Sequence, residues 1–148
     1  MNSPEEIKGE KHFKQYDDDW ALRCVTEGRV EELKERYDTA KSWGHTLKWR
    51  GSVADAIIDA NPDKSVFVIN NLEMFDADPN QIGEKILSSN THYMNILVDN
   101  LNKFPKLDHN QIAQRLLASG YAKLMGHIFA KLKLDDAKKA EVDAFLNS

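Results

Sequence analysis

The sequence predicts an all-α protein, a right-handed stack of antiparallel helix pairs that forms a short α-solenoid of about seven to nine helices. Three observations carry this prediction. Apolar residues recur at the three- and four-residue spacing of a helix face. Glycines and prolines fall where these periodic segments stop. Two segments of the second half recur after about 30 residues, a period typical of stacked helical arrays.

Residues 1–50 are predicted to form the N-terminal helices. Residues 3–6, Ser-Pro-Glu-Glu, have the order of a helix start, with Ser at the N-cap, Pro at the first helical position and Glu after it. Aspartates at 17–19 precede a short apolar segment that Gly28 follows, which indicates a short helix with acids at its start and a left-handed stop. A second helix with Val30 on its apolar face is expected to end at Gly44.

The clearest pattern is an internal repeat in the second half of the chain. Residues 80–87, NQIGEKIL, recur as NQIAQRLL at 110–117, with half of the positions identical. Residues 71–75, NLEMF, recur as NLNKF at 100–104. Because two independent segments repeat at nearly one period, the sequence indicates a repeated pair of helices of about 30 residues.

The repeat contains its own helix starts and apolar faces. Asp78 and Asp108 each occupy an N-cap position with Gln at N3, an arrangement that satisfies backbone donors at a helix start. The stripe of each first helix consists of Ile82, Ile86 and Leu87, then Ile112, Leu116 and Leu117. The stripe of each second helix consists of Val68, Leu72 and Phe75, then Leu97, Leu101 and Phe104. The β-prone segment 65–69 is predicted to be helical because it aligns with 94–98.

These elements predict one helical domain over residues 1–148. Its parts are the N-terminal helices of residues 1–50, the helix pairs of residues 51–134 and a C-terminal capping helix within 135–148. The last helix is expected to carry a weak apolar face, as is usual for a terminal element. That face would consist of Ala137, Ala140, Val142, Ala144 and Phe145.

Two stretches resemble known repeat architectures. The segment from Trp20 to Tyr37 resembles the helix pair of an ankyrin-like repeat, although the Thr-Pro-Leu-His turn of that family is missing. The segment from Val53 to Leu132 resembles the broad class of HEAT- and ankyrin-like solenoids. The resemblance names an architecture and no particular family. It implies an extended, rigid surface with little cavity, which suits the binding of another macromolecule.

The amino-acid composition narrows the possible classes of protein. The 148 residues are 41% hydrophobic and 30% charged, as in a globular protein rather than a disordered one. The net charge of −4 argues against a nucleic-acid binder that uses its whole surface. Cys24 is the only cysteine, which rules out an internal disulfide and a zinc site built from cysteines. With neither a signal peptide nor a membrane span in the sequence, the expected location is the cytoplasm.

No catalytic constellation, cofactor motif or metal site is predicted. The histidines form no His-x-x-x-His pair, and the aspartates at 17–19 lack the glycine and distal Glu of a calcium loop. No nucleotide-binding or acyl-transfer signature occurs. Cys24 lies among apolar residues and is read as a small buried hydrophobe.

Two surfaces remain as candidates for partner binding. The first is an acid-free stretch, residues 41–50, in which aromatic and cationic side chains alternate. Its candidate residues are Trp43, His45, Lys48, Trp49 and Arg50. They suit a protein interface or stacking on nucleic-acid bases, and Trp43 and Trp49 could instead belong to the core. The second is a basic stretch that contains Arg115 and Lys123 and equally suits a solvated helix face.

The function expected from this reading is non-enzymatic binding of another protein, as an adaptor or as a stand-alone inhibitor or accessory factor of a larger partner. The first alternative is a nucleic-acid-binding helical repeat that uses Trp43, Lys48, Trp49 and Arg50, with Arg115 and Lys123 extending the track. The second alternative is an enzyme with an unfamiliar site. No motif identifies the partner or the oligomeric state.

Overall fold

The computed structural model describes residues 12–89, 94–120, 122–124 and 126–148. The predicted helix start at residues 3–6 lies outside this range. Contacts divide the chain into two compact units, Met1–Asp78 and Pro79–Ser148, and each is described by itself. Within the described ranges the fold is mostly helical, with nine α-helices, as the sequence predicts.

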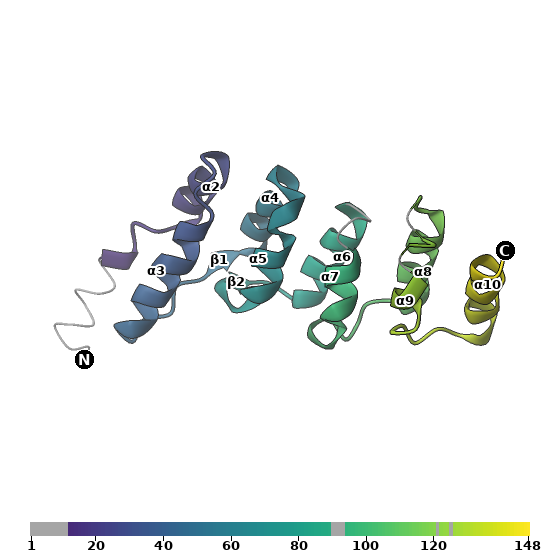
Figure 1. Cartoon of the computed structure of the whole chain (residues 1–148). Coiled ribbons are helices and arrows are strands. Elements are labelled where there is room, and N and C mark those ends of the chain that lie inside the picture. Colours follow the sequence, from purple (N-terminus) through teal and green to yellow (C-terminus); the bar gives the residue numbers. More distant parts are fainter. Residues whose placement is uncertain (1–11, 90–93, 121, 125) are drawn as a thin grey trace. The chain divides into compact units, whose positions relative to one another are not determined.

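The first unit holds four of these helices (Figure 1). They are α2 (Asp18–Thr26), α3 (Glu31–Ser42), α4 (Gly51–Ala60) and α5 (Ser65–Asn70). Short 3-10 turns, η1 (Pro62–Lys64) and η2 (Leu72–Met74), flank α5. The second unit holds α6 (Pro79–Ser89), α7 (Met94–Asp99), the 3-10 turn η4 (Leu101–Lys103), α8 (His109–Ala118), α9 (Gly126–Phe129) and α10 (Asp136–Leu146).

Aspartate caps begin three of the helices. The carboxylate of Asp17 accepts from the backbone N–H of Trp20, and that of Asp135 accepts from Lys138. Asp108 accepts from the two backbone donors at the second and third positions of α8. These bonds satisfy N–H groups that have no partner inside the helix. The predicted start of the short helix after Asp17 and the predicted cap at Asp108 are therefore confirmed.

Glycines with positive φ end the first two helices. Gly28 follows α2 with φ 73° and Gly44 follows α3 with φ 79°. Residues with a side chain rarely adopt this left-handed conformation, and glycine does so without steric cost. Both predicted stops are confirmed.

One short sheet departs from the predicted all-α class. Strand β1 (Trp49–Arg50) pairs in parallel with β2 (Phe75–Asp76), with Trp49 opposite Phe75. The pairing joins the segment just before α4 to the segment just after η2. Because backbone groups that leave a helix still need partners, two extended residues on each side form a short ladder here. Apolar spacing does not reveal a pairing this short.

The second helices are shorter than the sequence predicts. The β-prone residues 65–69 do lie in α5, and 94–98 lie in α7, as predicted. However, α5 ends at Asn70, so Leu72 falls in η2 and Phe75 in β2. The side-chain amide of Asn71 donates to the carbonyl oxygen of Phe67 at 2.8 Å, which gives the last turn a local partner in place of a continued helix.

The predicted apolar stripes of the first helices lie largely in the core of the second unit. Ile82, Ile86 and Leu87 are buried in α6, and Ile112 and Leu116 are buried in α8, with Leu117 half-buried. Helix α6 packs against α7. In α10, Val142 is the only buried residue, which confirms the expected weak face.

Two glycines lie where another segment of the chain comes close to a helix. A Cβ on Gly51 would lie 2.7 Å from the Cβ of Ala77, and a Cβ on Gly83 would lie 2.9 Å from Cδ1 of Phe104. Both distances are below an ordinary van der Waals contact, so each glycine lets a neighbouring segment come near its helix.

Polar side chains in the first turns of three helices accept hydrogen bonds from the backbone of later segments. The Oδ1 atom of Asp18 in α2 accepts from the backbone N–H of Arg50 at 3.0 Å, just before α4. The Oδ1 atom of Asn80 in α6 accepts from the backbone N–H of Lys106 at 2.9 Å, just before α8. The Oδ1 atom of Asn110 in α8 accepts from the backbone N–H of Asp135 at 3.2 Å, just before α10. Each bond therefore links the first turn of one helix to the approach of a later one within the same unit.

Candidate protein-interaction surface

An aromatic cluster occupies the start of the described chain and the segment between α3 and β1. Each ring of this aromatic cluster has a neighbouring ring whose centroid lies within 6.4 Å of its own. Its members are His12, Phe13, Tyr16, Trp20, Trp43, His45 and Trp49. The cluster brings together two stretches of sequence, and it determines which of the predicted site residues are accessible.

Trp49 lies inside the core of the first unit. Only 1% of its surface is exposed, and its indole N–H donates to the backbone carbonyl of Tyr16 at 2.9 Å. The ring stacks against Trp20 with centroids 6.0 Å apart. The buried N–H thus has a partner, as a buried indole requires. Trp49 therefore belongs to the core in this structure and offers no ring face to a partner.

Trp43 has the opposite environment. It follows α3 directly and is 51% exposed. One face stacks on His12 at a centroid distance of 5.7 Å and an interplanar angle of 18°, and Phe13 meets it edge-on at 5.6 Å. A large aromatic side chain that is supported on one side and open on the other has little conformational entropy left to lose on binding.

The remaining candidates of the 41–50 stretch differ in availability. His45 is half-buried, with its ring 5.8 Å from Phe13, and Lys48 is exposed. The Arg50 side chain is 83% exposed, yet its Nε lies 3.2 Å from a carboxylate oxygen of Asp18. The charge of Arg50 is thus partly compensated within the unit. The stretch is a mixture of core and surface rather than one continuous face.

The structure also shows supporting residues that the sequence did not indicate. His12 and Phe13 hold Trp43, although they lie far from it in the sequence. The Arg36 guanidinium lies 5.1 Å from the ring centroid of Tyr16, a cation–π distance, and its Nε is buried without a hydrogen-bond partner within the described structure. No local pattern relates these positions, because the approach of residues 12–16 to α3 is tertiary.

Arg115 and Lys123 lie in the second unit. Arg115 is exposed near the end of α8. The Nζ of Lys123 donates to the carbonyl oxygen of Ser148 at 3.0 Å and lies 5.8 Å from the ring centroid of Phe145 in α10. The ammonium of Lys123 is therefore occupied in part by contacts within its own unit.

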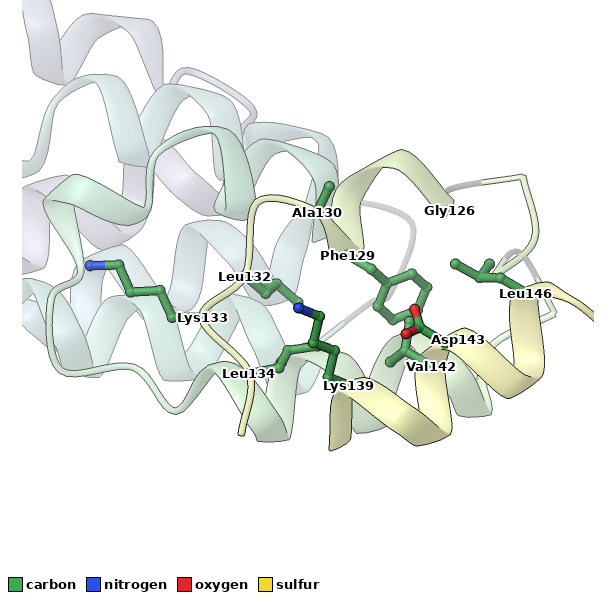
Figure 2. A pocket seen from close by; sticks show the side chains of 10 residues that line it. All are labelled: Gly126, Phe129, Ala130, Leu132, Lys133, Leu134, Lys139, Val142, Asp143 and Leu146. Carbon is green, nitrogen blue, oxygen red and sulfur yellow. The ribbon is translucent and has the colours of Figure 1, made fainter. Parts of the chain in front are cut away.

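A groove between α9 and α10 is a further candidate that the sequence did not reveal. It encloses about 490 Å³, and Figure 2 shows the side chains that line it. Phe129, Leu132 and Val142 are its buried apolar lining, and Leu146 is 37% exposed. Lys139 and Asp143 of α10 also line the groove. With Lys133, which precedes α10, the groove combines an apolar floor with three charged side chains.

The residues with shifted pKa values do not line this groove. Burial raises the pKa of the Cys24 thiol, and hydrogen bonds to Glu27 and Glu32 raise the pKa of Arg29. A hydrogen bond from Lys64 lowers the pKa of Glu31. In the part of the chain that the structure describes, no group of three or more His, Cys, Asp or Glu side chains is placed to hold a metal ion. Nor does any helix there have the length and apolarity needed to cross a bilayer.

Comparisons with protein-family models, with curated proteins and with solved structures found no match to this chain.

Proposed function

We propose that this chain is a non-enzymatic protein-binding module, built from stacked helix pairs, that uses Trp43 as the anchor of its contact surface. The observation that carries the proposal is the environment of Trp43, which is 51% exposed and stacked on His12. Tryptophan is enriched among the residues that contribute most to protein–protein binding. An exposed Trp that is already held in place supplies contact area with a small ordering cost.

The helix-pair architecture is supported by bonds that recur along the chain. Asn71 and Asn100 each donate to a carbonyl four residues earlier, in both cases at 2.8 Å and between an α-helix and a 3-10 turn. Asn80 and Asn110 each accept from the backbone before a later helix. Since these pairs fall at matching positions of the sequence repeat, they support a unit that repeats in its hydrogen bonding as well as in its sequence. Stacked units of this kind present extended binding surfaces.

Protein is favoured over nucleic acid as the partner. A nucleic-acid track along residues 41–50 would need stacking faces and free cations together. Trp49 is buried, and Arg50, although exposed, is paired with Asp18. Of the residues proposed for the 41–50 part of that track, this leaves Trp43 and Lys48. The net charge of −4 weakens attraction to phosphates further.

The test uses the full chain as bait in its native cell extract, followed by binding measurements with the purified captured protein. Trp43→Ala should weaken that binding by roughly 10- to 100-fold, the effect of removing an anchor side chain. Leu22→Ala, at another exposed apolar residue of the first unit, is the matched control and should leave binding unchanged. Equal effects of the two variants, or binding to oligonucleotides at low salt that Trp43→Ala abolishes, would contradict the proposal.

A further inference from the structure

The backbone of Trp43 is fixed by the end of α3. Its N–H donates to the carbonyl oxygens of Thr39 and Ala40 at 3.3 and 3.0 Å. Gly44, with φ 79°, then ends the helix. The orientation of the exposed indole therefore depends on its two side-chain dihedral angles alone. Whatever restricts these two angles determines how the ring is presented to a partner.

Residues 12–16 form a turn whose rings contact that indole. The His12 ring stacks on Trp43, with centroids 5.7 Å apart and an interplanar angle of 18°. The Phe13 ring meets Trp43 edge-on at 5.6 Å. Both are favourable aromatic geometries. Because one contact is stacked and the other is edge-on, together they restrict rotation of the indole more than either contact would alone.

Hydrogen bonds fix the turn itself. The backbone N–H of Tyr16 donates to the carbonyl oxygen of Phe13 at 3.0 Å. The side-chain amide of Gln15 donates to the carbonyl oxygen of His12 at 2.8 Å. The indole N–H of Trp49 donates to the carbonyl oxygen of Tyr16 at 2.9 Å, and since Trp49 is a core residue, this bond ties the turn to the core of the first unit. A path of contacts thus runs from the buried tryptophan through the turn to the exposed one.

We propose that the turn of residues 12–16 positions Trp43 for binding. His12 is the positioning residue, and the bond from Trp49 to Tyr16 anchors the turn. Because the turn orients the indole before a partner arrives, less side-chain entropy is lost when the partner covers the open face of the ring. His12 therefore contributes to affinity through Trp43. The inference rests on the proposed protein-binding function, but its first test needs no partner.

NMR relaxation of the indole N–H groups measures the order of Trp43 in the full chain. The order parameter of that group should be about 0.8 in the unsubstituted chain and below about 0.6 in His12→Ala. His12→Phe keeps a planar ring that can stack and should restore the higher value. Lys14→Ala, at an exposed position of the same turn, is the matched control and should leave the value unchanged. An unchanged order parameter in His12→Ala would overturn the inference.

The role of Trp49 is tested with the same measurement, after circular dichroism has shown that each variant is folded. Trp49→Phe loses the bond to Tyr16, so it should lower the order parameter of Trp43. In a chain that already carries His12→Ala, the same substitution should lower it by much less, because the stacked contact with the turn is already gone. No loss in Trp49→Phe, or an equal loss in both backgrounds, would exclude the turn as the link between the two tryptophans.

Affinity for the purified captured protein gives the second readout. His12→Ala should weaken that binding by about 3- to 10-fold, which is the cost of ordering one more side chain, and His12→Phe should restore it. If the indole loosens in His12→Ala while the affinity stays the same, the positioning inference is wrong. If Trp43→Ala itself leaves the affinity unchanged, the proposed function fails, whereas the order measurements still stand.

Discussion

Asn71 and Asn100, which align in the sequence repeat, make the same hydrogen bond. The Nδ2 of each donates to the carbonyl oxygen four residues earlier, Phe67 and Ile96 respectively, at 2.8 Å. Each Asn lies at the junction of an α-helix and a 3-10 turn, with φ of −133° and −119°. The amide thus satisfies a carbonyl at a helix end that has no intrahelical partner, and it fixes where the second helix stops.

This relationship predicts equal costs at the two positions. Asn71→Ala and Asn100→Ala should each lower the free energy of unfolding by about 1 kcal/mol, because each leaves a carbonyl without its donor. Asn70→Ala, one residue earlier and exposed, should change it by less than about 0.5 kcal/mol. Urea unfolding followed by circular dichroism measures all three. A cost at Asn71 with none at Asn100 would show that the matching bonds are not equivalent.

The two tryptophans of the 41–50 stretch should respond differently to removal. Trp49→Ala should destabilise the protein by about 3–5 kcal/mol, since it removes a buried aromatic side chain. Trp49→Phe should cost less, because it keeps an aromatic ring in the core, although the smaller phenyl ring leaves some space and the indole bond to Tyr16 is lost.

Trp43→Ala, by contrast, should cost about 1 kcal/mol or less, because half of that side chain is already in water. Circular dichroism is the suitable readout, since the substitutions remove fluorophores. A larger loss at Trp43 than at Trp49 would reverse the assignment of core and surface.

Because Gly51 lies close to Ala77, replacing Gly51 by a larger residue should destabilise the protein. Alanine usually improves a helix position occupied by glycine, by about 1 kcal/mol. Here the added Cβ would lie 2.7 Å from that of Ala77, so Gly51→Ala should instead cost about 1–3 kcal/mol. The double variant Gly51→Ala with Ala77→Gly exchanges the methyl group across the contact and should recover most of the loss. Thermal unfolding of the three variants tests this; an additive double variant would exclude the contact.

The pair formed by Lys64 and Glu31 predicts a pH effect. The hydrogen bond from Lys64 lowers the pKa of Glu31 in the folded protein. A lowered folded pKa gives stability that is present above the unfolded value and is lost as the pH falls through the folded one. Lys64→Met should therefore raise the pKa of Glu31 and lower stability at neutral pH more than in strong acid.

Carbon-detected NMR titration of the Glu31 carboxyl measures this directly. Lys64→Arg keeps the positive charge and should retain most of the lowering. An unchanged Glu31 pKa in Lys64→Met would mean that the pair does not form in solution.

Local signals in the sequence were sufficient for the starts of α2 and α8 and for the end of α2. Asp17, Asp108 and Gly28 act through their own side chain or backbone within a few residues, so pattern and structure agree. The helical state of 65–69 also followed, because alignment with 94–98 outweighed its local β propensity. The prediction of one domain with boundaries after residues 50 and 134 stays a prediction.

Features that depend on tertiary contacts could not be predicted from these local signals. Trp43 and Trp49 have similar neighbours in the sequence, and only the approach of residues 12–20 buries one and supports the other. The pairing of β1 with β2 involves two residues on each side, too few to leave a periodic pattern. The groove between α9 and α10 depends on two faces that meet only in the fold.

The most direct test of the proposed function places a photoreactive amino acid at position 43 of the full chain and irradiates it in the native cell extract. If Trp43 anchors a protein-binding surface, covalent adducts with a protein partner should form, and mass spectrometry identifies them. The same amino acid placed at Leu22 should give far fewer of these adducts. Adducts with nucleic acid alone, or equal protein adducts from both positions, would contradict the assignment of Trp43 as the anchor of a protein-binding surface.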